Sequence, residues 1–357
     1  MQPFFSRFSC CVALTFVAWL GRSAATVFGA TISTVPVGNA GNAGDPQLQG
    51  TFGAVAYEYR IGKTEVTNAQ YAEFLNAVAA SDPYGLYNTF MGTAVYGGIY
   101  RNGVPGSYTY TVKPDVIGQG PGGSNYTYAD KPIRYVSWYD AIRFANWLHN
   151  GQGGGDTEDG AYTILGGTPI PSNGDSITRN PAARWFLPNE DEWYKAAYYD
   201  PSGFYYDYPN GSDTAPNNNL PSTDTGNSAN FGGAAGNILY PYTDAGAYPL
   251  SKSPYGTSDQ GGNVWEWTET PHNVTDRVTR GGGWKDSSDS MATFQGASRG
   301  FSDPFNEGTS TSPAPGFRVA SAMIIPEPMS LTLVLAATAT LVVCCTRPRG
   351  GRLERGA

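Results

Sequence analysis

An alternating segment near the start of the chain predicts a β-strand between Val55 and Ile61. Apolar and aromatic residues occupy every second position there, namely Val55, Tyr57, Tyr59 and Ile61. Side chains of a strand point alternately to its two faces, so this period of two predicts a strand with one buried face. The residues expected to face outward are Ala56, Glu58 and Arg60.

Three further segments begin with N-cap residues and continue with helical spacing. The first is a capping box, in which the side chains of Thr67 and Gln70 bond each other's backbone amides. Ser137 and Asp140 form a looser version, with Asp in place of Glu or Gln, and Asn189 precedes an acidic first turn. The residues expected to face inward or to extend these helices are Tyr71, Phe74, Leu75 and Val78 in the first, Trp138, Ala141, Ile142, Ala145 and Leu148 in the second, and Trp193 and Ala197 in the third.

The rest of the body has the pattern of short strands and turns, which together with these helices predicts an α+β fold. The chain contains 46 Gly and 26 Pro, a content that alone would favour disorder. It also contains 24 Tyr, 16 Phe and 8 Trp, and disordered chains are poor in aromatic residues. We therefore expect a compact, loop-rich fold held together by aromatic packing.

Both ends of the chain are hydrophobic. Arg7 precedes an apolar run over 8–20, and small residues follow at 23–25, which predicts a signal peptide over residues 1–25. Near the other end, residues 329–345 carry no charge and are followed by a cluster of arginines. This pattern predicts a transmembrane segment with the arginines on the cytoplasmic side and the body of the protein exported. The alternative, a buried C-terminal helix, fits poorly with arginines at its end.

A tripeptide, Pro326-Glu327-Pro328, stands directly before this apolar segment. Together with the segment and the arginine tail it resembles the PEP-CTERM sorting signal of bacterial exported proteins, here residues 326–357. The resemblance implies an exosortase as the partner that removes the tail, and a final location at the cell surface or in the extracellular matrix. It leaves open whether the tail is removed or stays as a membrane anchor.

The four cysteines, at positions 10, 11, 344 and 345, all lie in the terminal hydrophobic segments. The body between them can therefore form no disulfide and offers no thiol. The chain has a formal net charge of -8, and the body alone is more acidic because both ends carry an excess of arginine. An acidic surface argues against nucleic acid as a partner and is compatible with cation binding.

Six short motifs occur in order along the body, at 62–71 (GKTEVTNAQY), 136–140 (VSWYD), 186–193 (FLPNEDEW), 262–267 (GNVWEW), 280–284 (RGGGW) and 316–320 (GFRVA). Together they resemble the formylglycine-generating enzyme, or sulfatase-modifying factor, family over residues 31–321. The resemblance implies a variant of the C-type-lectin-like fold with little regular secondary structure. This agrees with the loop-rich α+β fold expected from the pattern of the chain.

The family's catalytic members use copper held by two cysteines to oxidise a cysteine of a sulfatase to formylglycine. In this chain Asp286 and Met291 stand where the resemblance places those two thiols. Cu(I) prefers soft sulfur ligands and a carboxylate is hard, so Asp286 cannot replace a thiolate in this chemistry. We therefore expect no copper and no catalytic residues of the family's kind.

The resemblance also implies calcium, which catalytic relatives bind at two places. The first set of ligands would be Asp259, Gly262, Val264 and Glu266, with glycine and valine acting through backbone carbonyls. Two carboxylates and backbone oxygens in one short segment suit a hard cation. The alternative is that Glu266 caps a turn and Asp259 is solvated. The second set would be Asn230, Phe231, Asn237 and Leu239, where Asn237 replaces the family's aspartate.

These observations favour a non-catalytic protein of this family that binds a peptide or an exopolysaccharide in its groove, at the cell surface or in the matrix. The first alternative is an active oxidoreductase, either of the formylglycine-generating type or with another chemistry in the same cleft. The second is a structural matrix component without a specific ligand. An open groove with exposed Trp or Tyr would favour binding, and a closed apolar groove would favour a structural role.

Overall fold

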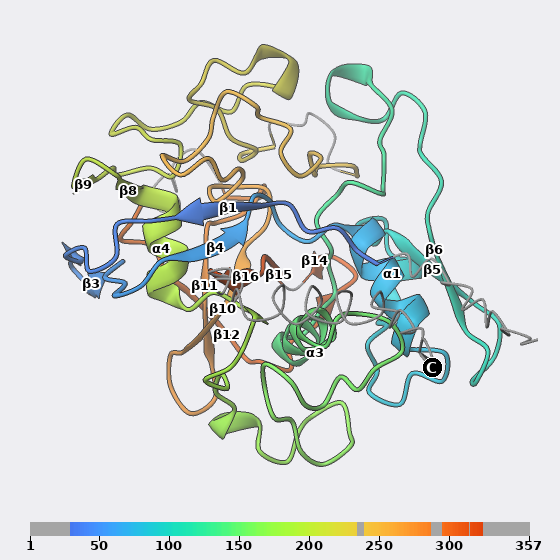
Figure 1. The fold of residues 1–357 in the computed structure, drawn as a ribbon. Coiled ribbons are helices and arrows are strands. Elements are labelled where there is room, and N and C mark those ends of the chain that lie inside the picture. The colour runs from blue at the N-terminus through green and yellow to red at the C-terminus, as the bar shows by residue number, and fades with distance from the viewer. Residues whose placement is uncertain (1–28, 234–238, 287–294, 314, 324–357) are drawn as a thin grey trace, which may run out of the picture.

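The computed structural model describes residues 29–233, 239–286, 295–313 and 315–323 (Figure 1). The predicted signal peptide, sorting signal and transmembrane segment lie outside these ranges. Within the described ranges, no helix is long and apolar enough to cross a membrane.

Two four-stranded sheets organise the β structure. The first is antiparallel and brings together strands from both ends of the body, in the order β1 (Thr34–Val37), β4 (Tyr59–Gly62), β16 (Ala320–Ala322) and β7 (Trp185–Phe186). The second has the order β12 (Gly300–Ser302), β11 (Arg277–Arg280), β10 (Glu266–Pro271) and β15 (Gly316–Phe317), with β10 and β15 parallel. Since β15 and β16 follow each other in sequence, the 316–320 motif connects the two sheets.

Shorter elements complete the described part of the chain. Antiparallel two-stranded ribbons are formed by β2 (Asp45–Gln47) with β3 (Gly50–Phe52), β5 (Ile99–Asn102) with β6 (Thr109–Val112), β8 (Tyr199–Asp200) with β9 (Phe204–Tyr205), and β13 (Gly308–Thr309) with β14 (Ser312–Pro313). Single 3₁₀ turns cover Pro121–Gly123, Gly174–Ser176 and Pro221–Thr223. Most of the connecting chain is irregular, as Figure 1 shows for the yellow-to-orange segment between β9 and β10.

The predicted strand over Val55 to Ile61 is wrong in its first half, because β4 begins only at Tyr59. The backbone of Val55 pairs elsewhere: its carbonyl accepts from Gly41 N (2.8 Å) and its amide donates to the Asn42 side chain (3.3 Å). The chain then bends, leaving Tyr57 46% exposed. The alternating pattern therefore predicted correctly that residues 55, 59 and 61 are buried, but it predicted too long a strand.

The three predicted helices are confirmed as α1 (Asn68–Val78), α3 (Trp138–His149) and α4 (Glu190–Tyr198). Each begins with a complete capping box, including the Ser137–Asp140 version, since both reciprocal hydrogen bonds are present in every one. A further short helix, α2 (Phe90–Thr93), was not predicted. It has no side-chain cap, and four residues are too few to show a helical period.

Helix α3 is buried on every side, not only on the face expected from its apolar residues. The polar Arg143 and Asn146 are both fully buried. Arg143 forms two hydrogen bonds to the Glu158 carboxylate (2.7 and 2.9 Å), and Asn146 bonds the backbone of Thr157 and Tyr162. The loops that follow α3 therefore cover its polar side. Their hydrogen bonds with Arg143 and Asn146 hold these loops in place.

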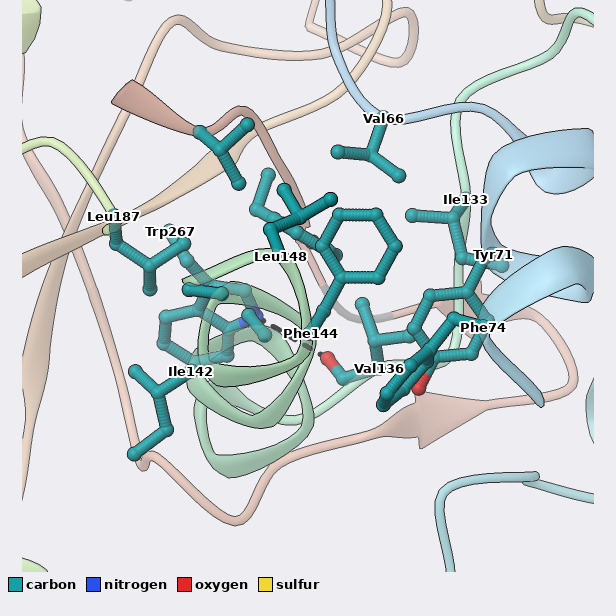
Figure 2. Packing of buried hydrophobic residues seen from close by; sticks show 14 of the residues in the cluster. Val66, Tyr71, Phe74, Ile133, Val136, Ile142, Phe144, Leu148, Leu187 and Trp267 are labelled. Carbon is teal, nitrogen blue, oxygen red and sulfur yellow. Dashed lines mark hydrogen bonds between the residues drawn. The ribbon is translucent and has the colours of Figure 1, made fainter. Parts of the chain in front are cut away.

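The main hydrophobic core surrounds α3 (Figure 2). The ring of Phe144 contacts those of Phe74 and Phe317 at centroid distances of 5.4 Å each, and that of Trp147 at 5.5 Å. The indole of Trp267 donates to the Val136 carbonyl at 3.2 Å, which ties β10 to the start of the helix. Helices α1 and α3 and both sheets thus share one core, as expected for a mixed α and β fold rich in aromatic residues.

Candidate functional site

A groove with a volume of about 190 Å³ lies between the start of β10, the loop after β11 and β14. Its walls come from segments far apart in sequence, and include Arg134, Tyr242, Trp265, Trp284, Lys285, Asp286 and Ser312. The groove is open to solvent at Lys285 and Ser312, which are exposed, and half-buried at Trp265 and Asp286. It is therefore a polar opening with aromatic walls and not a closed apolar cavity.

The loop after β11 places Trp284 and Asp286 in this groove. Gly281 and Gly282 have φ angles of 99° and 70°, which side-chain-bearing residues rarely adopt. Two hydrogen bonds close the turn. The Asp286 carboxylate accepts a hydrogen bond from the Gly283 amide at 2.7 Å, and the Trp284 amide donates to Asn263 O at 3.1 Å. The three consecutive glycines of the motif thus set the direction of the residue at position 286.

Asp286 occupies the position that the family resemblance assigned to a thiol. Burial raises the pKa of this carboxyl, while hydrogen bonds from the Gly283 amide and the Trp265 side chain act in the opposite direction. The carboxylate is thus held as a fixed hydrogen-bond acceptor on the groove wall. The second of the two positions, Met291, lies outside the described residues.

Aromatic rings pack edge-on along one wall of the groove. Trp284 and Tyr242 are 7% and 1% exposed, and both rings contact Tyr96 at about 6 Å in edge-on arrangements. Two cations lie over these rings: Arg134 at 4.8 Å from the Tyr242 centroid and Lys285 at 5.4 Å from that of Trp284. Neither the arginine nor Tyr242 belongs to one of the six sequence motifs, so neither was predicted as a wall residue. Arg134 stands two residues before the 136–140 motif, but only the fold brings it and Tyr242 to the same wall.

Beneath the groove, Glu266 and Arg318 form a fully buried ion pair. The guanidinium donates two hydrogen bonds of 2.6 Å to the carboxylate, and the Trp193 indole donates a third at 2.8 Å. Arg318 also donates to Gly62 O and Ser258 O, at 3.0 Å each. This one pair therefore joins the 62–71, 186–193, 262–267 and 316–320 motifs.

The first predicted calcium set is gathered in this region, but its carboxylates already have partners. Glu266 accepts the three donors just described, and Asp259 accepts the Gly246 amide. Gly262 packs against Asn230, where a Cβ would lie 2.5 Å from the backbone oxygen, and Val264 is buried. In the described ranges no group of three or more His, Cys, Asp or Glu residues is placed to hold a metal ion. A cation at Glu266 would have to compete with Arg318, so calcium here stays a prediction.

Another carboxyl lies in the same buried region. Glu65 is 1% exposed, and burial, followed by the charges of Asp259 and Glu266, raises its pKa well above the usual range. Its Oε1 accepts from the Asn263 side chain at 3.2 Å, which suits a protonated or an ionised acid equally. Burial also raises the pKa of Asp259, to about 6. Glu65, Asp259 and Glu266 therefore all interact electrostatically with the guanidinium of Arg318.

The second predicted calcium set contains one atom that fits a hard cation. The Oδ1 atom of Asn230 is buried and has no hydrogen-bond partner among the described residues. The Nδ2 atom of the same side chain donates to Pro241 O (2.9 Å) and to the Asn263 side chain (3.0 Å). Phe231 is buried and Leu239 is 55% exposed, whereas Asn237 lies outside the described residues. This set therefore remains a prediction, with a buried amide oxygen in its favour.

Comparison with known proteins identifies a family model that covers the body and relatives that match part of it. The model of the sulfatase-modifying factor enzyme 1-like domain matches residues 32–323. Hercynine oxygenases from Mycolicibacterium smegmatis and Mycolicibacterium thermoresistibile are 27% and 28% identical to the chain over 214 residues, which is 60% of this chain. The chain spans only 37% and 36% of those relatives. Treponema denticola variable protein 1 has a TM-score of 0.51 over 83% of this chain and 97% of its own, at 20% identity, which shows a shared fold.

Proposed function

Because the chain belongs to the sulfatase-modifying factor family, we propose that it is an exported, non-catalytic member that binds a peptide or a polysaccharide in the groove around Asp286. The observation that carries this proposal is the environment of that carboxylate. It is held by the Gly283 amide and by Trp265 at the position where oxidation would need a thiolate. A hard oxygen ligand does not support Cu(I) chemistry.

The groove has the chemistry of a recognition site for a polar ligand. A fixed carboxylate accepts hydrogen bonds from hydroxyl or amide groups, Arg134 and Lys285 supply donors and positive charge, and Trp265 supplies a half-exposed aromatic wall. Small-ligand sites usually combine apolar walls with a few fixed polar groups in this way. Such a groove also agrees with the lectin-like architecture expected for the family.

The predicted terminal segments support a location outside the cell for this recognition. The proposed signal peptide exports the body, and the proposed sorting signal brings it to the surface or the matrix through an exosortase. In either location a peptide or an exopolysaccharide is within reach of the groove. The membrane is then contacted through the C-terminal segment and not through the body.

A second candidate function is an oxidoreductase, and the relatives named hercynine oxygenase favour it. The two proposals are separated by incubating the purified protein with copper and a cysteine-containing sulfatase peptide, followed by mass spectrometry of the peptide. We expect no formylglycine, because Asp286 replaces a thiolate. Turnover by the wild type that is lost in Asp286→Ala would establish the oxidoreductase and overturn the non-catalytic proposal.

Binding in the groove is tested with the same sulfatase peptide and with soluble bacterial exopolysaccharides, by calorimetric titration. We expect Trp265→Ala to weaken binding of the recognised probe by about thirtyfold, since truncating a central aromatic anchor costs ~2 kcal/mol or more. Trp185→Ala is the matched control, because this half-buried tryptophan lies on β7, away from the groove. Equal losses in both variants would show that neither probe uses the groove.

Calcium is proposed as a structural cofactor at the second predicted set. We expect the melting temperature of the protein, first dialysed against chelator, to rise as Ca²⁺ is added to about 10 mM, because a ligand that binds only the folded state stabilises it by mass action. Mg²⁺ at the same concentration is the control, since its small radius and strict octahedral geometry suit such a set less well. A melting temperature unaffected by Ca²⁺ would remove the cofactor from the proposal.

A further inference from the structure

The groove around Asp286 is locally positive, although the protein as a whole is acidic. The charged side chains in its walls are those of Arg134, Lys285 and Asp286, two cations and one carboxylate. The whole chain, in contrast, has 30 acidic residues against 22 basic ones and a formal net charge of -8 at pH 7. A concave site lined by an excess of one charge raises the local concentration of ligands of the opposite sign. The groove therefore favours an anionic ligand, which most of the molecule repels.

Each of the two cations lies over one ring of an aromatic pair. The rings of Tyr242 and Trp284 meet edge-on, with their centroids 6.0 Å apart. Arg134 is 7% exposed and lies over Tyr242, whereas the exposed Lys285 lies over Trp284. Nζ of Lys285 also donates to the carbonyl of Thr311 at 2.7 Å, and it forms no ion pair with any residue of the described ranges. One cation is thus held in the wall of the groove and the other at its mouth.

The size of the groove limits how much of a ligand it can hold. Its volume of about 190 Å³ is below the roughly 300–1,000 Å³ of ordinary small-ligand pockets. A site of this size holds a single ring or a single side chain. The groove is open at Lys285 and Ser312, which are both exposed, so a longer ligand can continue beyond the rim. Its dimensions therefore suit one unit of a polymer.

The groups in the walls determine what that one unit must carry. Trp265 is half-buried and offers an aromatic surface to an apolar ring face. The Asp286 carboxylate, which the Gly283 amide holds at 2.7 Å, accepts hydrogen bonds and repels anions, so hydroxyl groups must face it. Arg134 and Lys285 bind an anionic group. A hexuronate carries an apolar ring face, hydroxyls and a carboxylate on one ring, whereas an acidic amino-acid side chain carries only the anion.

We propose that the groove recognises a hexuronate unit of an acidic polysaccharide, with the carboxylate of the sugar bound by Lys285 and Arg134 and its hydroxyls by Asp286. This inference deepens the proposed function and rests on it, since the groove must be the binding site. It selects an acidic polysaccharide over a neutral one and over an acidic peptide. Carboxylic acids are ionised at neutral pH, so the attraction is present under ordinary conditions. It must weaken as salt is added, because Lys285 is exposed and its charge is screened.

Calorimetric titration of the purified protein with polygalacturonate and with its methyl ester tests the charge of the ligand. The two polymers share the same sugar ring, and only the first has free carboxylates; chelator keeps divalent cations from the acid. At about 50 mM NaCl we expect the acid to bind about tenfold more tightly, since hydrogen bonds to charged groups are the stronger ones. At about 500 mM NaCl, where the Debye length is only ~4 Å, the preference should fall to about twofold. Equal affinities at low salt would overturn the inference and leave the groove's binding role intact.

Lys285→Gln locates the contact with the carboxylate, because it removes the charge and keeps a polar side chain. We expect the preference for the acid over the ester to fall from about tenfold to about threefold, and Lys285→Arg to restore it. Lys252→Gln is the matched control, since it removes the same charge from a half-exposed lysine that does not line the groove. A preference that is equal in Lys285→Gln and Lys252→Gln would overturn the assignment of the carboxylate to this cation.

Polyglutamate and the variant Trp265→Ala separate this inference from the proposed function. If polyglutamate binds as tightly as polygalacturonate and both lose affinity in Trp265→Ala, the groove is a binding site but the sugar assignment is overturned. If no probe responds to Trp265→Ala, the groove is not the binding site and the proposed function itself fails. Binding of polygalacturonate above polyglutamate and the ester, lost in Trp265→Ala, supports both.

Discussion

Replacing Arg318 by Met is expected to lower the free energy of unfolding by about 3–5 kcal/mol, the usual cost of removing one partner of a buried ion pair. Both side chains are fully buried. Without the guanidinium, Glu266 would keep only the Trp193 donor and would face the carboxyls of Glu65 and Asp259 with no cation between them. The loss is measured as the change in the urea midpoint at constant slope, in the presence of chelator.

The double variant Arg318→Met/Glu266→Gln separates the cost of an unpaired charge from the cost of lost packing. We expect it to recover part of the loss, because no buried charge remains and the glutamine can still accept from Trp193. Arg60→Met is the surface control: the side chain of this half-exposed arginine donates to Thr34, so a change within about 1 kcal/mol is expected. A loss below about 1 kcal/mol for Arg318→Met would contradict the central role of the pair.

The helices could be predicted because their signals are local. Each capping box involves residues three positions apart, and the expected hydrogen bonds are present for Thr67, Ser137 and Asn189. The strand predicted from Val55 was wrong in length because strand pairing is not a local property. Its length depends on which backbone groups lie opposite, and at this position the partner is the loop at Gly41 and Asn42 and not strand β1.

The site could be predicted only through motifs. The 280–284 glycines indicated the loop that carries Asp286, but its hydrogen bonds to Gly283 and Trp265 depend on the folded turn. The ion pair between Glu266 and Arg318 joins two motifs whose contact no local pattern shows.

Replacing Phe144 by Ala is expected to cost about 3–5 kcal/mol of unfolding free energy, as large-to-small changes in aromatic cores do. Phe144 is fully buried on α3, and its ring lies 5.4 Å from Phe74 and from Phe317 and 6.0 Å from Tyr71. These neighbours belong to α1 and β15, so the ring holds three elements together (Figure 2). The cavity left by its removal cannot close without moving one of them.

The matched control is Phe305→Ala, because Phe305 is 43% exposed and its loss should change stability by less than about 1 kcal/mol. Phe144→Leu should fall between the two, since it removes less volume and keeps an apolar side chain. The order is checked by urea unfolding of all three variants, with a common slope required for comparison. If Phe144→Ala and Phe305→Ala lost equal amounts, the shared core of helices and sheets would not be the principal source of stability. The loss in Phe144→Ala therefore measures how much of the fold's stability one ring of the core around α3 supplies.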